Sequence, residues 1–74
     1  MVEAEDLQSL KTIALLGGCR GPIWLSSQSL GNELGISPQT ASRRLIALER
    51  QQFVIRSMKP DGQYVAITRE GEQV

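Results

Sequence analysis

Apolar residues recur at helical spacing in the first two thirds of this 74-residue chain and at strand spacing in the last third. The spacing predicts a first helix over 3–16 whose acidic first turn suits the helix dipole. Gly17 and Gly18 end this helix. Its predicted core stripe consists of Leu7, Leu10 and Ala14, with Ile13 and Leu16 beside them.

The segment 30–48 predicts two short amphipathic helices around a tight corner. Ser26 caps the first of them, over 27–34, and Gly35 supplies the left-handed residue that closes it. Ser37 caps the next helix, over 38–51, and Pro38 suits its first position because no backbone N–H is needed there. One face of this helix carries Ala41, Leu45 and Leu48 at the spacing of buried residues.

The pattern becomes extended after this helix. Runs at 53–58 and 63–68 predict two strands, joined by a turn over 59–62 that carries Pro60 and Gly62 at suitable positions. An earlier short strand is predicted over 23–25. Thr68 caps a last helix that stops within a few residues. This order predicts an α+β, mainly α, winged helix-turn-helix: a three-helix core, a β-hairpin wing and a truncated last helix.

Length and composition fit one small domain over residues 1–74, which we expect to be the N-terminal part of a longer protein. The chain is 41% hydrophobic and 22% charged, as is ordinary for a globular domain. No apolar run approaches the roughly 20 residues that span a bilayer, and the N-terminus is acidic, unlike a secretory signal. We therefore expect a cytoplasmic protein with no membrane partner.

The chain lacks the residues on which most catalysis depends. It has no histidine and one cysteine, Cys19, so it has neither an internal disulfide nor the spacing of a metal site. We interpret Cys19 as a small buried or loop residue. The glycines at 17, 18 and 21 are not followed by the Lys-Ser/Thr of a nucleotide loop. We expect no enzyme activity, no metal and no cofactor in this chain.

Charge is balanced overall but unevenly distributed. Eight basic and eight acidic residues give a formal net charge of zero. Residues 1–37 hold two basic and four acidic residues, whereas 38–60 hold five basic residues and one acidic residue. The resulting +4 falls on the segment that a helix-turn-helix places against phosphates.

Helical phasing then predicts which side chains meet double-stranded DNA. Residues near the start of the 38–51 helix lie deepest in the major groove, and Arg and Gln suit bidentate contacts with guanine and adenine. The predicted base-reading residues are Gln39, Thr40 and Arg43. The predicted backbone contacts, which include the wing over 53–68, are Ser37, Ser42, Arg44, Arg50, Arg56, Lys59 and Gln63.

Four further side chains have other or open interpretations. Ile46 lies on the predicted exposed face and can meet a thymine methyl, a partner or the wing. Trp24 sits among apolar neighbours and is interpreted as core. Tyr64 fits the core, the wing surface or an interface. Asp61 repels phosphate and is given a turn-forming role only.

Resemblance to known families makes the expected function more specific. SPQTASRRLIALERQQFVIR and ITREG resemble the recognition helix, first wing strand and last helix of prokaryotic winged-helix regulators. LKTIALLGG, PIWLSSQSLG, ISPQTASRRLIALE and MKPDGQYVAIT resemble the N-terminal domain of archaeal CTP-dependent riboflavin kinases. That resemblance implies transcriptional control of riboflavin genes and a C-terminal kinase domain whose active site lies beyond Val74. Gln52 departs from the pattern, because many winged helices have glycine there.

Three hypotheses follow. The first is a sequence-specific DNA-binding domain of a transcriptional regulator, used as a homodimer on a two-fold site. The second is a protein-interaction or dimerisation module attached to an enzyme, since fold does not fix function. The third is a regulatory domain that reports the state of an attached kinase.

Overall fold

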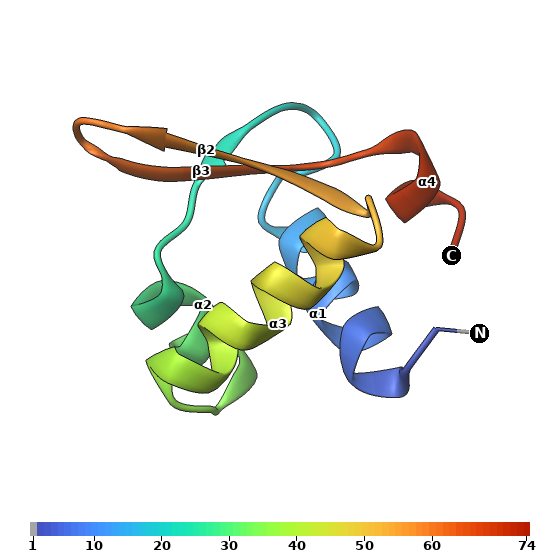
Figure 1. Cartoon of the computed structure of the whole chain (residues 1–74), viewed down its shortest axis with the longest axis horizontal. Helices are drawn as coiled ribbons and strands as arrows, with labels where there is room; N and C mark the ends of the chain where they lie inside the picture. The colour runs from blue at the N-terminus through green and yellow to red at the C-terminus, as the bar shows by residue number, and fades with distance from the viewer. Residues whose placement is uncertain (1) are drawn as a thin grey trace.

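The computed structural model describes residues 2–74 and has the predicted winged helix-turn-helix fold (Figure 1). Three antiparallel strands form one sheet in the order β1-β3-β2. In chain order the elements are α1 (Ala4–Leu15), β1 (Ile23–Trp24), α2 (Ser27–Leu34), α3 (Pro38–Arg50), β2 (Val54–Lys59), β3 (Gly62–Ile67) and α4 (Arg69–Glu72).

Local signals set the start of three helices. The side chains of Ser26, Ser37 and Thr68 accept hydrogen bonds from backbone N–H groups three residues later, at 3.0, 3.2 and 3.1 Å. Each bond satisfies one donor that the first helical turn leaves free. The predicted caps of α2, α3 and α4 are therefore confirmed.

A single core joins the helices to the inner face of the sheet. The predicted inward triplet of α3 is fully buried. It packs with residues of α1, α2 and the sheet in one cluster, which contains Leu10, Ile13, Leu25, Leu30, Ala41, Leu45, Leu48, Val54 and Val65.

The predicted core stripe of α1 is wrong in part. Leu10 and Ile13 are buried, but Leu7 and Leu16 are each 41% exposed and Ala14 is half-buried. The helix is rotated so that Asp6 and Ser9 share its buried face. The Gln51 amide, which donates to Asp6 at 3.0 Å, supports this rotation. The Ser9 hydroxyl is satisfied within α1, where it donates to the Glu5 carbonyl at 2.9 Å.

Gln52 provides the exit from α3 into the wing. It has φ 65°, the only positive φ of a non-glycine residue among residues 2–74. The Gln52 N–H donates to the Glu49 carbonyl and the Phe53 N–H donates to the Leu48 carbonyl, both at 2.9 Å. These bonds form a Schellman motif, so glutamine occupies a position that usually favours glycine.

The two ends of the long axis of the molecule differ. The wing turn and the α2–α3 corner lie at one end, whereas the start of α1, α4 and the C-terminus lie at the other (Figure 1). The molecule extends 33 Å along this axis. The start of α3 and the wing turn, which the sequence assigns to DNA, are thus remote from Val74 (Figure 1).

Candidate nucleic-acid interface

The corner between α2 and α3 brings the two helices into close contact. Gly31 is buried, and a Cβ there would lie 2.7 Å from the Ile36 carbonyl oxygen. Gly35 takes φ 71° and ends α2. The Ile36 N–H then donates back to the Gly31 carbonyl at 2.9 Å. This geometry fixes the direction in which α3 leaves the corner.

The first half of α3 carries two exposed, long polar side chains, Gln39 and Arg43. No side-chain hydrogen bond or ion pair within residues 2–74 involves either of them. Thr40 is half-buried between them, and its hydroxyl accepts from the Ser37 hydroxyl at 3.0 Å. Of the three predicted base-reading residues, two are therefore free and one is tied to the helix cap.

Arg44 faces α1 instead of lying open on the helix surface. Its guanidinium pairs with the Glu5 carboxylate at 3.3 Å, and its side chain is only 18% exposed. A shallow pocket lies beside this pair, between the start of α1 and α3, and its lining includes Arg43 and Asp6. Acidic groups of α1 thus lie next to the predicted reading face.

Arg56 lies in the middle of β2, opposite Val65, and not at the tip of the wing. Its Nη2 pairs with the Glu49 carboxylate of α3 at 2.8 Å, and its Nη1 donates to the Gln63 side chain at 3.2 Å. Gln63 in turn donates to the Leu25 carbonyl at 2.8 Å. Both predicted backbone contacts therefore belong to a network that joins the wing to α3 and to the segment after β1.

The remaining predicted backbone contacts are distributed around α3 and the wing turn. Ser37, Arg50 and Lys59 are exposed, and Ser42 is half-buried. Lys59 pairs with Gly62 in the hairpin register, which places it at the turn itself. Three cations of the basic segment, Arg43, Arg50 and Lys59, are thus exposed and lie outside the ion pairs of residues 2–74.

Trp24 is not part of the core, contrary to its interpretation from sequence. It is 53% exposed, and its indole N–H donates to the Asp61 carbonyl at 2.9 Å. The register pairs Trp24 with Tyr64 and pairs Ile23 with the buried Val65. Because successive side chains alternate between faces, Trp24 lies on the outer face of the sheet.

Two side chains, Trp24 and Tyr64, hold the wing turn in place. A Cβ at Gly62 would overlap the Trp24 indole nitrogen, so the ring packs directly on this glycine. The Tyr64 hydroxyl donates to the Asp61 carboxylate at 2.8 Å. This bond, together with desolvation and the negative charge of Asp61, raises the pKa of Tyr64 above 10.0. Asp61 therefore accepts two side-chain bonds besides forming the turn.

The internal bonds of Arg56 and the contacts of Trp24 and Tyr64 at the wing turn were not predicted from the sequence. One signal for Arg56 was present in the sequence. Alternation along β2 places Arg56 on the same face as the buried Val54, which is the face that meets α3. Nothing local in the sequence pairs Trp24 with a turn 37 residues later. Ile46, predicted to be exposed, is half-buried.

Residues 2–74 hold neither a membrane-spanning helix nor a cluster of metal ligands. None of the helices there has both the length and the apolar character that a membrane crossing requires. Over the same residues, no group of three or more His, Cys, Asp or Glu side chains is placed to hold a metal ion.

The fold is a winged helix, and solved structures of MarR-family proteins share it. A MarR-family protein from Bacillus stearothermophilus matches 97% of this chain and 47% of its own length, with a TM-score of 0.79 and 17% identity. The Staphylococcus aureus MepR–DNA complex matches 97% of this chain and 50% of its own, with a TM-score of 0.75 and 18% identity. These likenesses establish the fold.

Sequence relatives are more specific. The chain is homologous to the N-terminal part of archaeal proteins named riboflavin kinase, as the sequence resemblance predicted. It is 94% identical over 73 residues to the one from Methanoculleus marisnigri and 58% identical over 72 residues to the one from Methanoregula boonei. These matches cover 99% and 97% of this chain but only 33% and 32% of the relatives. No family model matches the chain.

Proposed function

We propose that this chain is a sequence-specific, double-stranded DNA-binding domain of a transcriptional regulator. The observation that carries the proposal is the exposed pair Gln39 and Arg43, held one helical turn apart on the first half of a capped helix. In this proposal α3 enters the major groove and the wing lies on the flanking backbone. The likeness of the fold to MepR in its complex with DNA supports the assignment.

The distribution of free and paired cations refines the contacts. Gln39 and Arg43 read base edges, because they are free and near the start of the helix. Arg50 and Lys59 meet phosphates, and Ser37, Ser42 and the positive end of the helix add neutral contacts. Thr40, Arg44, Arg56 and Gln63, also predicted contacts, must exchange an internal bond for one to DNA or reach it with their remaining donors.

The names of the relatives suggest the wider setting. We propose that the full-length protein is a CTP-dependent riboflavin kinase whose active site lies beyond Val74, and that its winged helix controls riboflavin genes. We further propose a cytoplasmic homodimer that binds two half-sites about one helical turn of DNA apart. The isolated 74-residue chain should then show no riboflavin kinase turnover.

Selection from random double-stranded DNA, followed by titration at several salt concentrations, tests the proposal. Gln39→Ala should relax the preference at one base position, by roughly 1–3 kcal/mol. Arg50→Ala should weaken all sequences uniformly and reduce the salt slope by about one. Arg20→Ala removes the same charge from an exposed loop and serves as the control. A wild-type protein that selects no sequence contradicts the proposal.

One observation favours the second candidate function, a protein-interaction module. The outer face of the sheet that forms the wing carries two large apolar side chains in exposed positions, Trp24 and Ile55, whereas the exposed Met58 lies on the other face. Exposed apolar groups that cluster on one element mark interaction sites more often than scattered ones do. Salt-independent co-purification of a protein partner, without retention on DNA, would favour this function over the first.

A further inference from the structure

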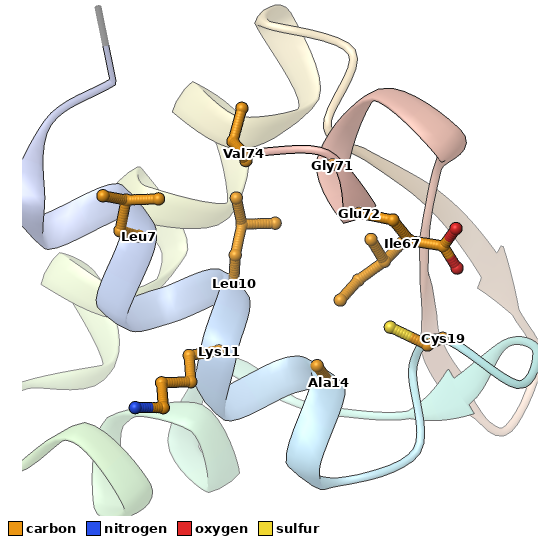
Figure 2. Close-up of a pocket in the computed structure, with 9 residues that line it drawn as sticks. All are labelled: Leu7, Leu10, Lys11, Ala14, Cys19, Ile67, Gly71, Glu72 and Val74. Atoms are coloured by element: carbon orange, nitrogen blue, oxygen red, sulfur yellow. The ribbon is translucent and has the colours of Figure 1, made fainter.

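An apolar groove lies between α1 and the C-terminal part of the chain, with a volume of about 340 Å³. Leu7, Leu10 and Ala14 line it from α1 (Figure 2). Ile67, at the end of β3, and Val74 line it from the other side (Figure 2). Lys11 and Glu72 also contribute to the lining, so the apolar lining carries one charge of each sign.

The groove explains why the core stripe predicted for α1 is wrong in part. Leu7 and Ala14 are two helical turns apart and therefore lie on the same side of α1. The buried face of α1, with Leu10 and Ile13, meets the core, whereas Leu7 remains 41% exposed. Apolar side chains thus occupy two neighbouring faces of one helix. This pattern is typical of a helix that is covered on both.

The course of the chain indicates what covers the second face. Val74 is itself a lining residue and is 48% exposed, so residue 74 lies against the open groove. The relative from Methanoculleus marisnigri matches this chain over 73 residues, which are only 33% of its length. Because the match is to the N-terminal part of such a protein, about two thirds of its polypeptide follows this point. The groove lies at the end of the molecule remote from the wing turn, so an occupant leaves the proposed DNA interface open (Figure 1).

We propose that the groove is the docking site for the polypeptide that follows Val74 in the full-length protein. That segment continues beyond α4 and places apolar side chains against Leu7, Ala14 and Ile67. The contact joins the winged helix to the rest of the protein as a packed interface and not only through a linker. The proposal depends on the homology to the longer relatives and is independent of DNA binding.

Cys19 offers a direct test because it lines the groove and is an exposed thiol in the 74-residue chain. The measurement is the maleimide labelling rate at Cys19, resolved by peptide mass spectrometry. It is made in the full-length protein under native conditions, in the same protein unfolded in urea, and in the 74-residue chain. We expect labelling in the native full-length protein to be at least about tenfold slower than in the other two samples. Equal rates in the native and unfolded full-length protein overturn the proposal.

Two leucines of α1 provide a matched pair of variants in the full-length protein. Leu7→Ser changes a lining residue of the groove and should restore fast labelling at Cys19. Leu15→Ser changes a more exposed leucine outside the lining and should leave the rate as in the wild type. Protection that survives Leu7→Ser, or that disappears on dilution as for a second copy of the chain, contradicts docking of the downstream segment.

Discussion

The start of α3 and the strands of the wing each carry an arginine and a glutamine, but these side chains make different contacts in the two regions. On α3, Gln39 and Arg43 are exposed and have no side-chain partner within residues 2–74. On the wing, Arg56 and Gln63 bond to each other, and they also reach Glu49 and Leu25. An arginine and a glutamine are thus free for recognition in one region and committed to folding in the other.

The difference follows from geometry. A helix packed through one face projects its opposite face into solvent, so polar residues there remain available. A short hairpin has too little apolar surface to hold its own position and requires bonds to the helices. Basic residues near a proposed DNA interface therefore cannot be counted as contacts until their internal partners are known.

Arg43→Ala should have the largest effect, and only on binding. If Arg43 reads a base, sequence-specific affinity should fall by about 1–3 kcal/mol. The free energy of unfolding should change by less than about 0.5 kcal/mol, because the side chain is exposed. Anisotropy titrations and urea unfolding of the same samples measure both quantities. Loss of stability without loss of affinity would reverse the roles assigned to the two regions.

Gly62→Ala should destabilise the wing by about 2 kcal/mol, since it adds a Cβ against Trp24 at φ 137°. Thermal unfolding measures the loss. Gly35→Ala is the matched control: it also has a positive φ, but its Cβ meets no atom within 4 Å. It should cost only the backbone strain, about 1 kcal/mol. Equal losses in the two variants would show that neither the indole contact nor the larger φ at Gly62 adds to the cost.

Arg56→Ala should reduce stability by about 1 kcal/mol, because a partly exposed pair with Glu49 and a bond to Gln63 are lost together. Urea unfolding measures this effect. A double-mutant cycle with Glu49→Ala isolates the ion pair. The contrary result is that Arg56→Ala lowers DNA affinity as much as Arg43→Ala does, with unchanged stability. That result would show that Arg56 serves DNA binding and not the attachment of the wing to α3.

Gln52→Gly should stabilise the protein by about 0.5–1 kcal/mol at the junction of the two regions. Glycine relieves the strain at φ 65° and preserves the two backbone bonds that end α3, although it makes the unfolded chain more flexible. The melting temperature should rise by several degrees. Gln51→Gly, at φ −84°, has no strain to relieve and also removes the amide bond to Asp6, so it should destabilise.

Tyr64 should give the smallest effect. Its phenol ionises less readily in the folded protein because it donates to Asp61, so its pKa lies above 10.0. The neutral form is the one that folding favours. The stabilisation by the neutral Tyr64 phenol is therefore complete below pH 10.0, and it is lost as the pH rises through the raised pKa. Titration of the single tyrosine by phenolate absorbance should show the shift, and Asp61→Asn should reduce it.

Elements with local signals could be predicted from the sequence. The bounds of α2, the start of α3 and the turn of the wing each follow from a cap or a turn residue within three positions. Gln52 does not belong to this group, because glutamine in place of the usual glycine gives no local signal for the φ of 65° found there.

Features that depend on distant partners could not be predicted. The orientation of α1 rests on the bond between Asp6 and Gln51, and the position of Trp24 rests on Asp61. The phase of the 38–51 helix and the position of the hairpin predicted that Arg44 and Arg56 lie near DNA. Their carboxylate partners are Glu5, 39 residues before Arg44, and Glu49, seven residues before Arg56. Periodicity gives the face of an element but not the side chain that it meets.

The indole at the wing turn is an intrinsic fluorescent probe of the wing. Trp24 is the single tryptophan of the chain, is half exposed, and is bonded through its N–H to the turn. The tryptophan emission of the protein therefore reports on the wing turn alone. A change in the wing alters the polarity around this fluorophore and hence its emission. The rate at which the wing engages a ligand can thus be followed by stopped-flow in the unlabelled protein.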